Sequence, residues 1–155
     1  MRRLMKALIP TWLTVLLGGG RTRLSKFELE ILSSLDSLLS ALDKEAIREQ
    51  IAAIRLIQTS GAGTVVRFFL TDGYSGKRMA DTSQNHLLAV IKCLVDGKKL
   101  VVRAFSHDGL ISDLAVRPEV PRICKSFTLE SIVPGGRGKI SAAEAIDRME
   151  HGKSD

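Results

Sequence analysis

Cysteine is scarce in this chain of 155 residues, which contains only two. Cys93 and Cys124 are too few and too widely spaced for a disulfide framework or for a zinc site of paired ligands. Both lie in apolar runs, so we expect them to act as small buried hydrophobic side chains. A disulfide between them is an alternative only for an exported chain, because the cytosol keeps thiols reduced.

Aromatic residues and histidines are also few. Aromatic residues make up 5% of the chain, whereas apolar residues make up 45%. We therefore expect a core of Leu, Ile, Val and Ala, with few platforms on which bases or sugars could stack. His86, His107 and His151 are far apart, and none is spaced from another ligand-type residue as metal ligands are. The sequence predicts neither a metal site nor a cofactor.

Catalytic motifs are missing as well. The segment GGRGKIS departs twice from a phosphate-binding P-loop, because Val133 and Ile140 occupy the positions of the first glycine and of the final Ser or Thr. Ser106, His107 and Asp108 are adjacent, whereas the members of a catalytic triad converge from separate elements. No pair of carboxylates with a plausible common pocket stands out. The sequence therefore predicts a non-enzymatic protein.

Positive charge is concentrated at the N-terminus. The net charge is +6, and residues 1–26 hold six basic side chains and no acidic one. Since six of the 23 basic residues lie there, the other 17 balance the 17 acidic residues of the chain. A neutral body without a basic face argues against a nucleic-acid partner.

Residues 1–23 combine five of these basic side chains with an apolar run over residues 7–17. As a helix that run would be about 16 Å long, too short to cross a hydrocarbon core of about 30 Å. It could be a cleaved secretory signal, a segment that contacts a membrane interface or a partner, or a peripheral helix of its own domain. We expect residues 24–155 to form one domain, and a cytoplasmic location is favoured over a membrane-associated or exported one.

Two helices are predicted before the first strand. Ser25 and Glu28 match a capping box, so a helix should begin near residue 24. Apolar residues then recur at helical spacing as far as Leu42. Asp43 is placed to cap a second helix, which the pattern extends to about Thr59. The short connection predicts an antiparallel helical hairpin.

The rest of the chain is predicted to be mainly strands. Residues 64–70, TVVRFFL, are typical of a strand, and a long loop over residues 71–85 follows, named the long loop below. Residues 123–133 would add an edge strand, and residues 142–150 a short helix. The predicted fold is α+β: an N-terminal helical hairpin packed on an antiparallel β-meander of about four strands, with a short C-terminal helix.

Two Asp-Gly pairs predict hairpin turns. A two-residue turn at Asp96 and Gly97 sets Cys93 opposite Leu100 on an apolar face.

For the second pair, Asp108 and Gly109, a three-residue loop is preferred to a two-residue loop. It sets Asp113 opposite Arg103 and so keeps a carboxylate off the buried face.

Basic and aromatic side chains on the long loop and on the first hairpin are the candidate binding residues: Tyr74, Lys77, Arg78, Lys98, Lys99 and Arg103. We predict a non-enzymatic module that binds one protein partner. This architecture is similar to that of bacterial immunity and accessory proteins, a resemblance at the level of the fold alone.

Two other functions remain open. Residues 1–23 could target the protein to a membrane or for export. An enzyme with a site near the long loop would be favoured if its basic or aromatic side chains lined a deep pocket with His86 or His107.

Overall fold

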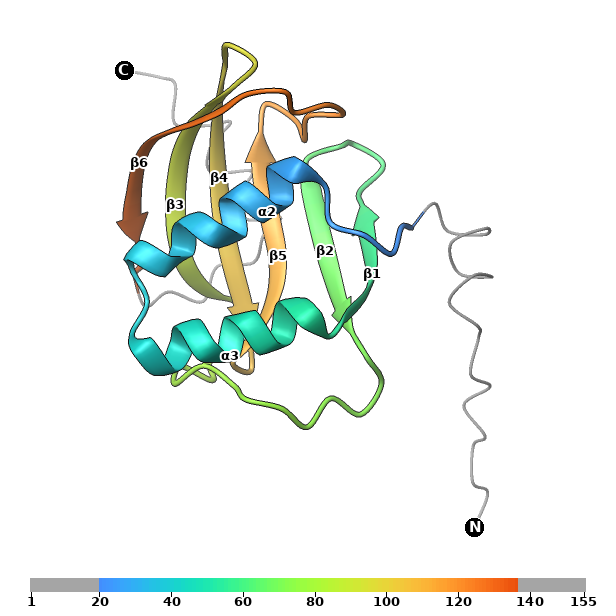
Figure 1. Ribbon diagram of the computed structural model, residues 1–155, viewed down its shortest axis with the longest axis vertical. Coiled ribbons are helices and arrows are strands. Elements are labelled where there is room, and N and C mark those ends of the chain that lie inside the picture. The colour runs from blue at the N-terminus through green and yellow to red at the C-terminus, as the bar shows by residue number, and fades with distance from the viewer. Residues whose placement is uncertain (1–19, 137–155) are drawn as a thin grey trace.

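Both described helices lie on the same face of one antiparallel sheet (Figure 1). The computed structural model describes residues 20–136. Helix α2 (Lys26–Ser34) runs across the strands, the chain turns back after the 3-10 helix η1 (Leu35–Ser37), and α3 (Ala41–Ala52) crosses the sheet again. The predicted α+β class is confirmed.

The sheet has six strands, whereas about four were predicted. They are β1 (Ile54–Thr59), β2 (Val65–Leu70), β3 (His86–Val95), β4 (Lys98–His107), β5 (Leu110–Arg117) and β6 (Phe127–Pro134). Their order is β1-β2-β5-β4-β3-β6, and every neighbouring pair is antiparallel. Strands β3 to β5 form the predicted meander, and the edge strand expected within residues 123–133 is confirmed as β6.

The start of the first helix is confirmed, whereas that of the second differs from the prediction. The Ser25 hydroxyl accepts from the Glu28 amide at 3.3 Å, and the Ser25 amide donates to the Glu28 carboxylate at 2.8 Å. The N-cap of α3 is Ser40 rather than Asp43, because the Ser40 hydroxyl accepts from the Asp43 amide at 3.2 Å and the helix begins at Ala41. Leu42, expected on the buried face of the first helix, is 78% exposed.

The prediction for residues 54–59 was wrong. They were expected to continue the second helix, but they form strand β1. Ile54 and Ile57 lie three apart, a spacing that also fits a helix. The helix ends at Ala52, however, and Ile57 pairs with Phe68 of β2. Side chains branched at Cβ favour a strand once a neighbouring strand supplies hydrogen bonds and packing. The neighbouring strand β2 is brought there only by the tertiary fold, so the local sequence pattern could not reveal it.

The first hairpin has the predicted register. Asp96 and Gly97 have φ angles of 49° and 79°, which are the positive values that a two-residue type I′ turn requires. Cys93 lies opposite Leu100, as expected.

The second hairpin has a different register from the predicted one. Its turn has only two residues, and the partners change by one between the Ser106–Ile111 and Phe105–Asp113 pairs. The extra residue, Ser112, forms a β-bulge. The carboxylate is kept off the core as required, but through a bulge rather than a longer loop. Asp113 lies opposite Phe105 instead of Arg103.

The hydrophobic core lies between the helices and the sheet face that they cover. Cys93 is fully buried in it, and Cys124 packs against it partly exposed, both as free thiols. Burial, and then the charge of Glu130, raises the pKa of Cys93 to about 11. The expectation of a small buried hydrophobic side chain is confirmed for Cys93, whereas Cys124 is partly exposed and its thiol donates to the Ser126 carbonyl.

One buried carboxylate joins the start of the described chain to α2. The Glu28 side chain is fully buried, and the Arg21 guanidinium binds both of its oxygens. The hydrogen bond to Glu28 is the main cause that raises the pKa of Arg21 above its ordinary value. Arg21 also exchanges two backbone hydrogen bonds with Ile57 of β1. The segment before α2 is therefore attached to the domain at residue 21.

Two expectations fall outside the described residues. The apolar run over residues 7–17 and the helix over residues 142–150 belong to the ranges 1–19 and 137–155, which are not described. Within residues 20–136, neither helix has the length and apolar character needed to span a bilayer.

Candidate functional site

The long loop is held against the β4–β5 turn. The Met79 amide donates to the Gly109 carbonyl at 2.9 Å. The Arg78 guanidinium donates to both the carbonyl and the carboxylate of Asp108, at 2.7 and 2.8 Å. Gly109 allows this approach, because it has a φ of 73° and a Cβ there would lie 2.9 Å from the Met79 carbonyl oxygen.

The long loop is also held against helix α3, along which it passes in Figure 1. The Ala80 amide donates to the Asp43 carboxylate at 2.9 Å, and the Lys77 ammonium forms an ion pair with Glu45. A loop with these attachments presents its side chains in fixed positions. Loops this long in a compact domain are usually either functional or mobile, and these contacts argue against mobility.

Gln50 joins all three elements and was missed by the sequence analysis. Its side chain is fully buried. Its amide nitrogen donates to the carbonyls of Lys77 at 2.9 Å and Gly109 at 3.0 Å, and its oxygen accepts from the Ile111 amide at 2.8 Å. The available signal was its position three residues after Ile47, which placed a polar residue on the buried face of a helix.

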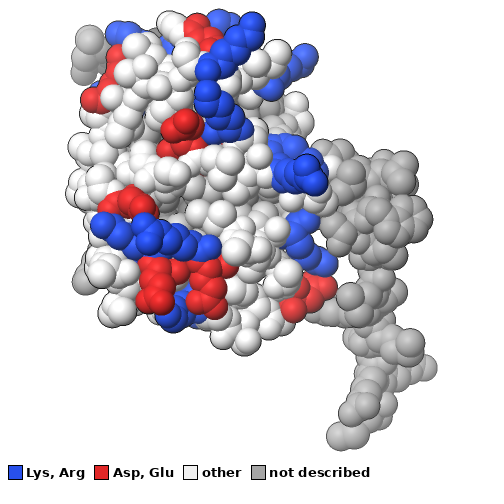
Figure 2. Space-filling model, in the orientation of Figure 1, with Lys and Arg blue, Asp and Glu red and all other residues white. Residues whose placement is uncertain are grey.

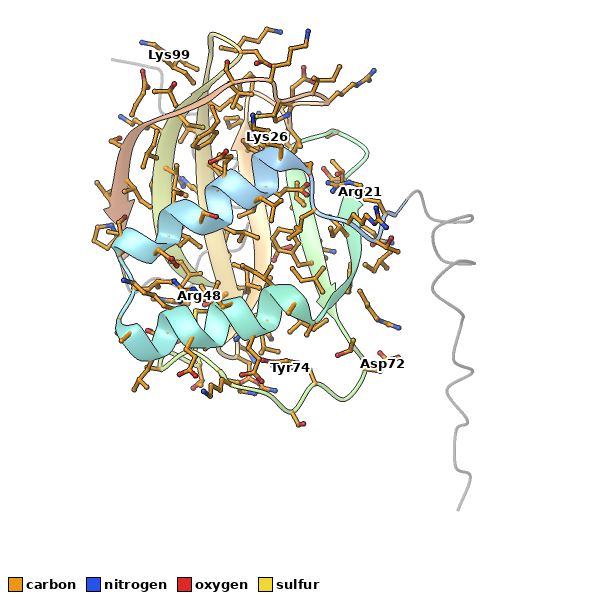
Figure 3. The ribbon with its side chains drawn as sticks, in the orientation of Figure 1. Arg21, Lys26, Arg48, Asp72, Tyr74 and Lys99 are labelled. Carbon is orange, nitrogen blue, oxygen red and sulfur yellow. The ribbon has the colours of Figure 1, made fainter. Side chains whose placement is uncertain are left out.

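The long loop and the ends of β2 and β5 enclose a depression of about 510 Å³, called the loop-end depression below. Its apolar floor is lined by residues of the two strands, of which Phe68 and Ile111 are themselves buried: Phe68, Phe69, Leu70, Leu110 and Ile111. Polar and charged side chains stand around that floor: Arg55, Asp72, Tyr74, Arg78, His107 and Ser112. Figure 3 labels Asp72 and Tyr74 at this end of the molecule.

The charges around the loop-end depression are paired with one another. Arg55 and Asp72 form an ion pair at 3.0 Å, and Arg78 and Asp108 form one at 2.8 Å. Such pairs near the surface contribute little stability, on the order of 0–1 kcal/mol each. Their effect here is to leave the rim close to neutral.

Tyr74 is the aromatic residue of this rim. Its hydroxyl donates to the Lys77 carbonyl at 3.1 Å. Partial burial, and then the nearby charge of Glu49, raises the pKa of Tyr74 above 10.0, although Arg78 opposes this shift. The phenol therefore stays protonated at neutral pH and keeps its hydrogen-bond donor.

The structure brings some of the predicted residues of the loop together and separates others. Tyr74 and Arg78 line the depression together with His107. The Lys77 ammonium is directed instead to its partner on α3. His86 lies near the carboxylate of Asp81, with its Nδ1 at 3.4 Å.

The basic residues predicted on the first hairpin lie elsewhere. Lys98 and Lys99 are exposed at the start of β4, and Figure 3 shows Lys99 at the opposite end of the molecule from Tyr74. Arg103 lies in the middle of β4, between Val90 of β3 and Ala115 of β5. The six candidate residues therefore do not form a single site.

The adjacent Ser-His-Asp residues do not form a triad. Ser106 is fully buried, whereas His107 is exposed and the Asp108 carboxylate is held by Arg78. Among residues 20–136, no group of three His, Cys, Asp or Glu side chains could hold a metal ion.

Comparisons with protein families, curated proteins and solved structures find no match to this chain.

Proposed function

We propose that this protein is a non-catalytic binding module that holds one protein partner at the loop-end depression. The observation that carries this proposal is the combination of an apolar floor and a polar rim on a loop that is already fixed by the rest of the fold.

The composition of the depression is that of a protein–protein contact. Interface centres are enriched in aromatic residues and Arg, and a polar rim surrounds the centre. Here Phe69 and Leu110 contribute to the apolar centre, and Tyr74 and Arg78 stand at its edge. The low aromatic content of the chain makes this grouping of aromatic side chains more informative.

Preorganisation supports the same conclusion. A loop that becomes ordered only on binding loses conformational entropy at that moment, which weakens the complex. Gln50 and the hydrogen bonds between the long loop and the β4–β5 turn fix the rim before a partner arrives. A partner therefore meets a rim that is already in place.

A protein fits this surface better than a nucleic acid does. Phosphate contacts need basic side chains that release their counterions on binding. The two arginines of the rim, Arg55 and Arg78, already have carboxylate partners. A nearly neutral rim with an apolar floor favours a partner surface of mixed polarity.

Affinity capture with matched variants tests the proposal. The full chain, its Tyr74→Ala and Tyr74→Phe variants, and an Arg48→Ala control on the exposed side of α3 are used to capture protein from native lysate. Quantitative mass spectrometry then measures the recovery of each captured protein. We expect one protein at about one copy per chain, retained by the control and reduced at least about tenfold by Tyr74→Ala. An aromatic hot spot contributes ~2 kcal/mol or more, which supports this estimate.

The Tyr74→Phe variant separates the ring from the hydroxyl and should retain most of the binding. A native lysate that yields no stoichiometric protein, or a captured protein that Tyr74→Ala retains in full, would contradict the proposal.

The enzyme alternative has one observation in its favour, because Tyr74, Arg78 and His107 share one depression. However, His107 is exposed and has no hydrogen-bonded partner to orient it within the described part of the chain, and Arg78 is engaged by Asp108. A general base is normally oriented by a third group, so this arrangement supports binding over proton transfer.

A role of the N-terminal segment in targeting is also kept as a proposal. A deletion that tests it should end at residue 19, because Arg21 is bound to Glu28 and Ile57 in the domain.

A further inference from the structure

A second pocket lies at the opposite end of the sheet, between the β3–β4 turn and the segment that connects β5 to β6. Its volume is about 400 Å³, and it is called the turn-end pocket below. We infer that this pocket is a second docking site, which takes an apolar side chain from a protein segment whose neighbouring residues are acidic.

The lining of the turn-end pocket is suited to an apolar side chain. Val95 and Leu100 form its buried part, and Pro118 and Pro121 stiffen the connecting segment beside it. Ile123 lines the same pocket and is nevertheless 68% exposed. A large aliphatic side chain held in this way loses its contact with water when a partner side chain enters, and removing apolar surface from water favours binding.

The pocket is also preformed. Asp96 of the β3–β4 turn holds the connecting segment, because its carboxylate accepts from the amides of Ser126 at 2.7 Å and Lys125 at 3.1 Å. The Lys26 ammonium of α2 fixes the same segment by donating to the Lys125 carbonyl at 2.8 Å. The two walls are thus tied together without a ligand.

Basic charge surrounds the turn-end pocket. Figure 2 shows basic side chains, with some acidic ones among them, at the end of the molecule where Figure 3 labels Lys99. Lys98 and Arg122 line the pocket and are exposed, and Lys26 and Lys125 are exposed at the connecting segment.

Two acidic residues of the pocket oppose this charge only in part. The lining carboxylates are those of Asp96 and Glu119, and the first is directed to backbone amides. Those amides, with Ser126 first, lower the pKa of Asp96 below 3.8. The lining itself holds two basic and two acidic side chains, and Lys26 and Lys125 at the connecting segment supply the basic excess that favours an acidic partner. The apolar lining favours a protein segment over a nucleic acid.

Titration with short peptides tests the inference. The full chain, labelled with ¹⁵N, is titrated at low ionic strength with the blocked heptapeptide EDEFEDE. The peptide EDEAEDE removes the apolar anchor, KRKFKRK reverses the charge, and an oligothymidine of ten nucleotides tests for nucleic acid. We expect EDEFEDE to shift the amide signals of Lys98, Leu100 and Ile123, and the other three ligands to bind at least about tenfold more weakly.

Variants of the protein provide the matched controls. Lys98→Glu/Arg122→Glu should weaken the binding of EDEFEDE about tenfold, and Ile123→Asp should do the same. The control Lys44→Glu/Arg48→Glu on α3 should change it less than about twofold.

Tyr74→Ala should leave peptide binding unchanged, so this result is independent of the function proposed for the loop-end depression. The inference is overturned by equal binding of EDEAEDE or KRKFKRK, by stronger binding of the oligothymidine, by shifts confined to other surfaces, or by no binding at millimolar peptide.

Discussion

Replacing Gln50 by Leu tests the claim that one buried amide holds the long loop. The two side chains have similar size, so the substitution removes hydrogen bonds with little change in packing. Gln50 makes three bonds, to the carbonyls of Lys77 and Gly109 and to the amide of Ile111. These bonds do not contribute equally.

The two carbonyls keep other donors after the substitution. The Gly109 carbonyl still accepts from the Met79 amide, and the Lys77 carbonyl still accepts from the Tyr74 hydroxyl. Each loss should therefore cost only about 0.5 kcal/mol. The Ile111 amide loses the acceptor that Gln50 supplies, which should cost about 2 kcal/mol.

Leucine offsets part of this loss, because burying it carries no desolvation penalty for a polar amide, a gain of about 1 kcal/mol. The net expectation is a decrease of about 2 kcal/mol in the free energy of unfolding.

Urea unfolding followed by circular dichroism measures this change. Gln58→Leu provides the control, since Gln58 is a half-buried residue of β1 and should change stability by less than about 0.5 kcal/mol. Hydrogen exchange adds local information, because the Met79 amide should exchange faster in Gln50→Leu. A decrease no larger than that of the control, or unchanged exchange at Met79, would refute the proposed role of Gln50.

Two further predictions concern the turns. Gly109→Ala should destabilise the fold more than Gly97→Ala in thermal unfolding, because both positions have positive φ but only at position 109 would a Cβ meet backbone, at Met79. We expect about 1–2 kcal/mol for the strain alone at Gly97 and at least about 1 kcal/mol more at Gly109, and equal costs would contradict the clash. Asp96→Asn should keep the turn but flatten the acid dependence of stability. The folded pKa of Asp96 lies below its ordinary value, so its contribution is present above about pH 4 and is lost as the pH falls through the folded pKa; a variant with the wild-type acid dependence would contradict this.

The sequence by itself determined the elements whose signals are local. The capping box at Ser25 and the two-residue turn at Asp96 involve residues within a few positions of one another, and both are confirmed. The burial of Cys93 follows from the same hairpin, because the turn sets the register.

Long-range contacts determined the secondary structure of β1 and the register of the second hairpin. The residues from Ile54 to Thr59 have a pattern that fits either a helix or a strand, and only pairing with β2 selects the strand. For the second hairpin, the sequence showed which residue had to avoid the core but not how the backbone achieves this. The need to keep Asp113 off the core was readable, but whether a longer loop or a bulge met it depended on the pairing of β4 and β5.

The candidate sites divide in the same way. Sequence identified the long loop and its residues Tyr74 and Arg78, because a long segment with little to bury stands out in a compact domain. It could not place His107 beside them, nor show that Lys98 lies at the other end of the sheet. Gln50 was hidden for the same reason, because its partners come from the long loop and the β4–β5 turn. The chain thus encodes its turns and caps locally, whereas its surfaces exist only once distant segments are packed together, since a site is defined by neighbours in space.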